Sequence, residues 1–169
     1  MRLRPPAPFD ASHDVAHFFS GEEPLDHWLK ERALGNQRDR FTRTFVVADQ
    51  SKRVVGYYSL SAGVILRKEL PRRLAIHGSP TTIPVALLAR LAVDLSMQGK
   101  GLGRALLADA IRKILLAAEN VAFRAIMVDA LNDQARSFYL RLGFVETRFD
   151  PLKLVLPLQD AIQSLNEKP

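Results

Sequence analysis

The chain has 169 residues, 47% hydrophobic and 25% charged, a balance typical of a soluble globular protein, and we expect residues 1–169 to form one domain. It contains no cysteine, which excludes disulfides, thiolate metal sites and a cysteine nucleophile. No apolar stretch reaches the ~18 residues of a transmembrane helix, and no apolar segment follows the basic residues of the N-terminus, so a cytoplasmic protein without membrane contact is expected.

The net charge of +6 is concentrated in one part of the chain. Between Leu25 and Arg73 there are eleven Lys and Arg residues and five acidic residues, so this segment accounts for the whole excess. Such a distribution favours an anionic partner, and nucleic acid is the obvious one. The alternative is that these are solvated surface side chains that keep the protein soluble. His13 and His17 could share a helix face, but a third ligand at metal-like spacing is missing, so no metal site is predicted.

The first half of the chain predicts a helix followed by a β-hairpin. Apolar residues recur at helical spacing over 24–37, and Gly35 is a reasonable end for this helix. Segments 44–49 and 53–65 are rich in β-branched and aromatic residues and are joined by a short polar turn, which favours a hairpin. The segment 67–83 is basic and interrupted by prolines, and we expect a long loop there.

The second half alternates strands and helices. In chain order we expect a strand over 85–95 buried on both faces, a helix from Leu102, a strand over 125–131, a helix that begins at Asn132 and ends at Gly143, strands over 144–149 and 153–158, and a tail helix after Pro157. The order helix, hairpin, β, α, β, α, β, β predicts an α/β fold around a mixed sheet.

Three glycines at alternate positions, Gly99, Gly101 and Gly103, lie where the chain passes from a strand into a helix. The first N–H groups of a helix are unpaired, and the helix dipole favours an anion at the same place. Glycines let the backbone approach a phosphate closely, and Lys100 and Arg104 would add positive charge. The spacing fits neither the P-loop nor the dinucleotide fingerprint, which disfavours ATP and NAD. The alternative is a glycine-rich turn without a ligand.

The run Gln98-Gly99-Lys100-Gly101-Leu102-Gly103 resembles the Q/R-x-x-G-x-G/A pattern of the GNAT N-acetyltransferase superfamily, and NDQARSFYLRLGF resembles that family's segment after the next strand. The resemblance implies a mixed, mostly antiparallel central sheet flanked by helices, and acetyl-CoA as cosubstrate. It implies that loop amides bind the pyrophosphate and that the preceding strand splays from its neighbour to pair with the pantetheine arm. The residues assigned to acetyl-CoA on this basis are Leu91, Ala92, Val93, Gln98, Gly99, Lys100, Gly101, Gly103, Arg104, Ala105 and Asn132.

Tyr139 occupies the position of the tyrosine that many GNAT enzymes use as general acid toward the coenzyme A sulfur. A tyrosine with a pKa near ~10 is protonated at neutral pH and can donate. The alternative is that Tyr139 only packs beside Phe138 and Leu142. A general base is not evident, since Asp94 would more commonly cap a helix or pair with Arg104. With no cysteine available, direct attack of the amine on the thioester is the natural route.

The segments FFSGEEPLDHWLKERALGNQ, RTFVVAD, VVGYYSLSAG and IPVALLARLAVD resemble GNAT toxins of bacterial type II toxin–antitoxin modules, of the TacT kind. Membership would imply acetylation of the α-amino group of aminoacyl-tRNA, inhibition of translation, a small ribbon-helix-helix antitoxin and a homodimer. The candidates for tRNA contact are Lys30, Arg72, Arg73 and Arg90. A second hypothesis is a GNAT enzyme for a small amine, peptide or protein. A third is a non-enzymatic binding module, against which the intact loop and Tyr139 argue.

Overall fold

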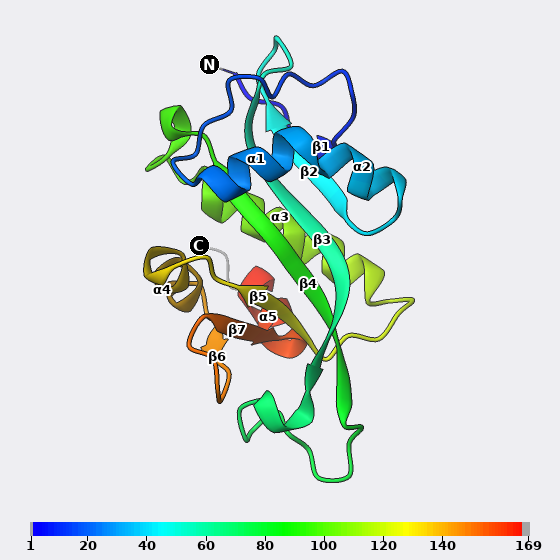
Figure 1. The fold of residues 1–169 in the computed structure, drawn as a ribbon. Coiled ribbons are helices and arrows are strands. Elements are labelled where there is room, and N and C mark those ends of the chain that lie inside the picture. The colour runs from blue at the N-terminus through cyan, green and yellow to red at the C-terminus, as the bar shows by residue number, and fades with distance from the viewer. Residues whose placement is uncertain (1, 167–169) are drawn as a thin grey trace. The chain divides into compact units, whose positions relative to one another are not determined.

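The computed structural model describes residues 2–166. The strands are β1 (Ala7–Pro8), β2 (Arg43–Ala48), β3 (Val54–Leu66), β4 (Thr82–Val93), β5 (Ala125–Asp129), β6 (Val145–Glu146) and β7 (Lys153–Pro157). The helices are α1 (Glu23–Glu31), α2 (Ala33–Arg38), α3 (Leu102–Ala117), α4 (Asp133–Arg141) and α5 (Leu158–Asn166), with short 3₁₀ turns η1 (Arg67–Glu69) and η2 (Leu95–Met97) (Figure 1).

These strands are hydrogen-bonded in the order β1-β2-β3-β4-β5-β7-β6. β4 pairs with β5 in parallel, whereas the β1–β2, β2–β3, β5–β7 and β6–β7 pairs are antiparallel. The prediction of a mixed, mostly antiparallel sheet flanked by helices is therefore confirmed. None of the helices described is long and apolar enough to cross a bilayer.

The contacts divide the chain into two units. The first holds the chain up to Ser61 together with Ala89–Ala110, and the second holds Ala62–Leu88 together with the chain from Ile111 onward. The strands β3 and β4 and the helix α3 each begin in one unit and continue into the other. The glycine loop belongs to the first unit, whereas α4 and β5 belong to the second.

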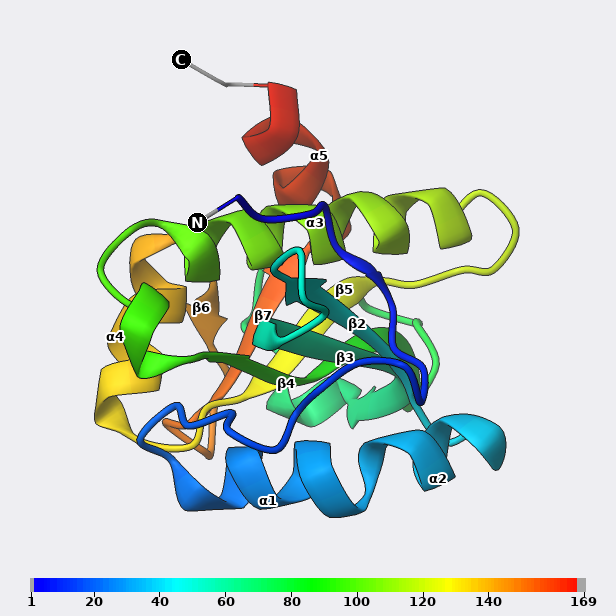
Figure 2. The same cartoon turned by 90° about the horizontal axis from the view of Figure 1, so that it is seen from above.

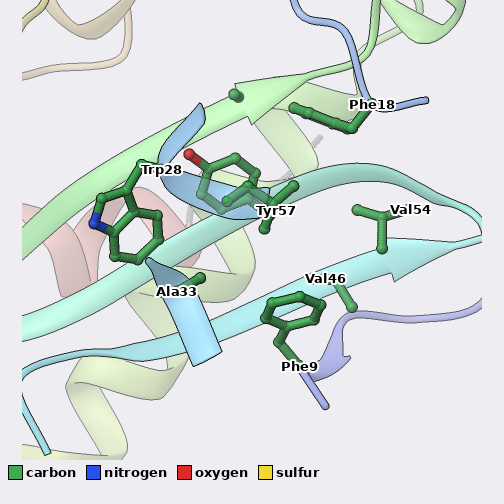
Figure 3. Close-up of a cluster of buried hydrophobic side chains, with 9 residues drawn as sticks. Phe9, Phe18, Trp28, Ala33, Val46, Val54 and Tyr57 are labelled. Atoms are coloured by element: carbon green, nitrogen blue, oxygen red, sulfur yellow. The ribbon is translucent and has the colours of Figure 1, made fainter. Parts of the chain in front are cut away.

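In the first unit, α1 and α2 lie on one side of β2 and β3, and the first turns of α3 lie on the other (Figure 2). The alternation of β3 side chains explains this arrangement, because successive residues of a strand face opposite sides. Tyr57 stacks on Trp28 of α1, whereas the hydroxyl of Tyr58 donates to Asp109 of α3 at 2.5 Å. Tyr57 thus joins a buried cluster under α1, which is drawn in Figure 3.

In the second unit, the parallel register of β4 and β5 runs from Val85↔Ala125 to Leu88↔Val128. All five residues of β5 pair with β7 on the other side. A second buried cluster consists of Ile65, Leu70, Leu74, Ile83, Val85, Ala125, Met127 and Val155. The basic loop over 67–83 is anchored by Leu70 and Leu74, two of these core residues.

Two expectations about the helix over 24–37 are wrong. The helix breaks at Arg32, where φ is −122° and ψ is −30°, and a separate helix α2 follows. Gly35 lies inside α2 and ends nothing, because α2 runs to Arg38. The break keeps Ala33 buried with Leu29 while Leu34, expected on the apolar face, is 41% exposed.

Several other boundaries differ from expectation. β4 begins at Thr82 and includes the exposed Pro84, and it ends at Val93, before the predicted end at 95. β4 is buried near Val85 and again at Ala92 and Val93, whereas residues 89–91 between them are partly exposed. The strand expected over 144–149 is reduced to β6, because the Thr147 hydroxyl and N–H both bond to the Lys153 carbonyl and turn the chain. The tail helix is confirmed as α5.

Candidate active site

The glycine loop joins η2 to α3 and is held in a conformation that needs glycine at two positions. Gly99 has φ +76° and Gly101 has φ +86°, in the left-handed region that other residues rarely adopt. A Cβ added to either residue would meet no atom within 4 Å. Packing therefore does not demand these glycines. The backbone conformation does, and the space in front of the loop is open.

The N–H groups of this loop are largely unused. Among the described residues, no backbone carbonyl is found to accept a hydrogen bond from the N–H groups of residues 99–104. The first hydrogen bond at the start of α3 runs from Ala105 N–H to Gly101 O, at 3.1 Å. Lys100 and Arg104 are exposed beside these groups, and the Lys100 ammonium reaches only the Ser96 carbonyl, at 3.2 Å. Unpaired N–H groups at the start of a helix with two cations beside them are suited to binding an anion.

The side chain of Gln98 fixes the loop to the end of β4. Its Nε2 donates to the carbonyls of Val93 and Ser20, both at 2.8 Å. The backbone N–H of Gln98 donates to the Leu95 carbonyl at 3.3 Å. Gln98, expected among the acetyl-CoA ligands, thus has its polar donors engaged within the protein, and its contribution is to position the loop.

Asp94 ties the same loop to the segment before α1. Its carboxylate accepts from Phe19 N–H at 2.9 Å, and from Ser96 N–H at 3.1 Å and Ser96 Oγ at 2.6 Å. Burial raises the pKa of Asp94, but these hydrogen bonds outweigh it, and the net result is a pKa below the usual value. Asp94 caps η2, as the sequence suggested, and is too strongly engaged to serve as a base.

The pairing of β4 with β5 ends at Leu88. The described ladder with β5 ends at the pair Leu88↔Val128, so Ala89–Val93 have no recorded β5 partner. Leu91, Ala92 and Val93, assigned to the pantetheine arm, lie in this stretch, and Gln98 holds its last carbonyl.

Asn132 and Tyr139 belong to the second unit. Asn132 caps α4, with Oδ1 accepting from Ala135 N–H at 2.9 Å, as expected. Tyr139 is 7% exposed and contacts the rings of Phe138 and Phe144, with centroids 5.1 and 5.3 Å away. Burial raises its pKa above the usual value. Within the described residues of its unit, no hydrogen bond to the hydroxyl is recorded.

The four candidates for tRNA contact differ in their surroundings. Lys30 is exposed on α1, and Arg72 is exposed in the basic loop. Arg73 pairs with Asp160 of α5 at 3.2 Å. Arg90 of β4 lies over the ring of Trp28, 4.1 Å from its centroid. Lys30 and Arg90 belong to the first unit, whereas Arg72 and Arg73 belong to the second.

Sequence reasoning missed two links. The sequence suggested a binding role for Gln98, but it did not indicate that the Ser20 carbonyl, distant in sequence, would accept a hydrogen bond from the Gln98 side chain. It placed Trp28 on an apolar helix face, with no sign that an arginine of β4 would cover it. Neither link has a periodic signal, because each joins segments far apart in the chain.

A family model described as an acetyltransferase (GNAT) domain matches residues 41–146. That range runs from the loop before β2 to the end of β6 and includes the glycine loop, the part of β4 beyond Leu88 and Tyr139. The chain belongs to the GNAT acetyltransferase family. It is therefore an N-acetyltransferase by family, and the glycine loop is the part of the fold that matches the motif read from the sequence.

Similar proteins are toxins of this family. The chain is 45% identical over 148 residues to a tRNA-acetylating toxin of Mycobacterium tuberculosis, with 88% of each chain covered. It resembles the crystal structure of a tyrosine-to-phenylalanine mutant of KacT, at 31% identity and a TM-score of 0.90, covering 96% of this chain and 99% of that one. It also resembles AtaT complexed with acetyl-methionyl-tRNAfMet, at 30% identity and a TM-score of 0.88, covering 98% and 99%.

Proposed function

We propose that this GNAT enzyme is a toxin that transfers the acetyl group of acetyl-CoA to the α-amino group of aminoacyl-tRNA and so stops translation. The observation that carries the proposal is an open glycine loop with unpaired N–H groups in a chain 45% identical to a tRNA-acetylating toxin over most of its length. The loop accounts for acetyl-CoA as the acetyl donor, and the similarity to the toxin accounts for aminoacyl-tRNA as the acceptor.

The loop and the adjoining strand supply the acetyl-CoA site. The N–H groups of residues 99–104, with Lys100 and Arg104, bind the pyrophosphate. The backbone of Leu91–Val93 pairs with the pantetheine arm and polarises the thioester carbonyl, and Ala105 and Asn132 complete the contacts. A solved relative, AtaTR bound with AcCoA, supports this choice of cosubstrate. We further propose that the two units act as one catalytic domain, residues 1–169.

The chemistry is direct transfer. The neutral α-amine attacks the thioester carbon, the carbonyl oxygen takes up negative charge, and the C–S bond breaks as the amide forms. Tyr139 donates its phenolic proton to the departing sulfur, the surplus proton of the amine passes to water, and the Tyr139 phenolate takes a proton back from water. The ester of aminoacyl-tRNA lowers the pKa of the α-amine, so a free nucleophile is available without a protein base. Relatives studied as tyrosine-to-phenylalanine mutants support the choice of a tyrosine.

The tyrosine is chosen by elimination as well. The chain has three tyrosines. Tyr57 and Tyr58 donate their hydroxyls to Leu25 O and Asp109 inside the first unit, which commits both to the fold. Tyr139 is the one whose hydroxyl has no recorded acceptor in the described part of its unit.

Partners and place of action follow from the same assignment. Solved relatives include AtaT bound to the C-terminus of the antitoxin AtaR, and a KacTA–DNA complex. For this chain we propose a small ribbon-helix-helix antitoxin, a homodimer and action in the cytoplasm, where charged tRNA is found. Lys30, Arg72, Arg73 and Arg90 are the proposed cations for the tRNA backbone, with binding that weakens steeply with salt.

The test is incubation of the protein with labelled acetyl-CoA and charged tRNA. Label is expected on the amino acid, and mild alkaline hydrolysis of the ester releases it as an N-acetyl amino acid; uncharged tRNA is the control. Label found only on free amines or proteins would replace the tRNA substrate with the alternative one. If calorimetry detected no binding of acetyl-CoA, the proposed acetyltransferase activity would be contradicted.

A further inference from the structure

Arg90 is held in a stack of three side chains inside the first unit. Its guanidinium carbon lies 4.1 Å from the centroid of the Trp28 ring. The Trp28 ring in turn stacks on Tyr57, with centroids 6.1 Å apart and planes 14° apart, and the Tyr57 hydroxyl is anchored to the Leu25 carbonyl at 2.8 Å. Figure 3 shows Trp28 and Tyr57 side by side in the buried cluster. We call these residues the Arg90 stack.

The Arg90 stack holds the guanidinium of Arg90 in place without occupying its N–H donors. In the described part of the chain, no hydrogen bond or ion pair is recorded for Arg90, although it is only partly exposed. Burial lowers the pKa of Arg90, which reports the cost of holding its charge away from water. Stacking on an aromatic face holds a guanidinium by its plane and leaves its N–H groups in that plane.

Three other arginines of this protein have acceptors within the chain. Arg73 meets Asp160, Arg38 meets Asp39, and Arg136 bonds to Glu146 and to the Pro151 carbonyl at 2.9 Å. A partly buried arginine with its donors unspent is costly to maintain unless something else receives them. The N–H groups of Arg90 are therefore available to an anionic ligand.

The position of Arg90 shows which anion of the substrate it can meet. Arg90 directly precedes Leu91–Val93, and a strand rises about 3.3 Å per residue, so the stack is anchored within about 10 Å, along β4, of the backbone assigned to the thioester arm. The aminoacyl group that must reach this arm is esterified to the terminal ribose of tRNA. The phosphate on the other side of that ribose is the nearest anion of the acceptor end.

Resting on the proposed function, we infer that Arg90 binds the terminal phosphate of the tRNA acceptor end, and that Trp28 is the positioning residue that holds the guanidinium in place. A planar fork of N–H groups matches two phosphate oxygens at once, whereas the ammonium of a lysine would act as an unoriented point charge. The inference assigns Trp28 a part in substrate recognition beyond the core.

The test compares two substrates that differ in phosphate. One is charged tRNA, and the other is the same amino acid esterified to adenosine, which carries the reacting amine but no phosphate. Arg90→Gln is expected to lower kcat/KM for charged tRNA by about tenfold or more, the usual loss for a charge-assisted hydrogen bond, and to leave kcat/KM for aminoacyl-adenosine unchanged. It should also reduce the slope of log KM against log salt by about one.

Two further variants separate positioning from charge. Arg90→Lys keeps the charge and loses the fork, so it should recover only part of the loss. Trp28→Phe keeps an aromatic ring and should give a smaller loss on tRNA alone. Arg148→Gln is the matched control, because Arg148 also lies over a ring, that of Phe149 at 5.4 Å, yet is exposed and in the other unit. It should act as wild type.

The outcomes are distinct. An equal loss on both substrates, or no loss on tRNA for Arg90→Gln, overturns the inference. A wild-type protein that acetylates neither substrate overturns the proposed function instead. Thermal unfolding of each variant identifies a loss caused by misfolding, in which case Arg90→Lys provides the decisive comparison.

Discussion

The side-chain nitrogen of Gln98 lies 2.8 Å from the carbonyl oxygen of Val93 and 2.8 Å from that of Ser20. One amide thus joins the glycine loop, the end of β4 and the segment before α1. This explains why the motif begins with a residue able to donate two hydrogen bonds, even though the proposed phosphate site consists of backbone N–H groups.

Gln98→Ala should weaken acetyl-CoA binding without touching the ligand. It leaves two carbonyls without a donor, a loss of about 1–3 kcal/mol shared between stability and loop order. Gln98→Glu should be worse than Gln98→Ala, because its carboxylate would face the same two oxygens. Calorimetric Kd and thermal unfolding measure both effects. An unchanged Kd for Gln98→Ala would mean that the loop keeps its shape unaided.

Gly101→Ala should lower acetyl-CoA affinity more than it lowers stability. Alanine at φ +86° is strained by about 1–2 kcal/mol, and its methyl would occupy the open space in front of the loop. Gly78→Ala is the matched control, since Gly78 has φ +82° and equally open surroundings but lies in the basic loop. Both variants should melt lower, and only Gly101→Ala should lose binding. Equal affinities would show that the ligand does not approach Gly101.

Tyr139→Phe should lower kcat by roughly 10²–10⁴, the range for loss of a general acid, with little change in acetyl-CoA affinity. The fold should persist because the hydroxyl has no recorded partner in its unit and the ring contacts with Phe138 and Phe144 remain. Single-turnover acetylation of charged tRNA measures the step. A variant as fast as wild type would reduce Tyr139 to a packing residue.

Stability at high pH gives a second view of Tyr139. Because burial raises its pKa above 10.0, the folded chain keeps the phenolic proton where the unfolded chain releases it. The contribution of Tyr139 to the free energy of unfolding is therefore fully present below pH 10. It is lost as the pH rises beyond 10, by at most about 1.4 kcal/mol per pH unit. Tyr139→Phe should make the fall shallower. Parallel curves from urea titrations between pH 9 and 11 would contradict burial of the phenol.

Asp160→Asn should strengthen tRNA binding. Asp160 engages Arg73 in a pair that is partly exposed, with side-chain exposures of 39% and 56%, and such a pair contributes about 0–1 kcal/mol. Removing the carboxylate frees Arg73 for a phosphate and should lower the tRNA Kd by about two- to fivefold. Glu119→Gln removes an exposed acid elsewhere and corrects for net charge. A Kd that moves equally in both variants would place Arg73 away from the RNA.

Local chemistry made much of this molecule predictable. The hairpin, the caps at Asn132 and Asp94 and the loop before α3 each depend on a few neighbouring residues whose preferences agree. The break at Arg32 has no such signal, because no proline or glycine stands there. It follows from which side chains the sheet can bury, as Ala33 and Leu34 illustrate.

In the candidate site, too, features set by single residues could be predicted and features set by tertiary contacts could not. The loop glycines could be found from spacing because positive φ is a property of single residues. The second role of Trp28 could not, since a tryptophan that packs in a core and one that also carries an arginine give the same helical pattern. Contacts between Gln98 and Ser20, or Arg90 and Trp28, depend on tertiary packing and need the fold.

The β4–β5 ladder that ends at Leu88 has a consequence for the unliganded protein. Bare strand edges invite other chains to add to the sheet, and proteins usually guard them with lysine, proline or a covering segment. Residues 89–93 cannot be guarded that way if a ligand must bond to their backbone. The acetyl donor would then act as a surrogate strand, and the amides of Leu91 and Val93 should exchange hydrogen more slowly once it is bound. Unchanged exchange at both amides would mean that acetyl-CoA does not pair with this part of β4.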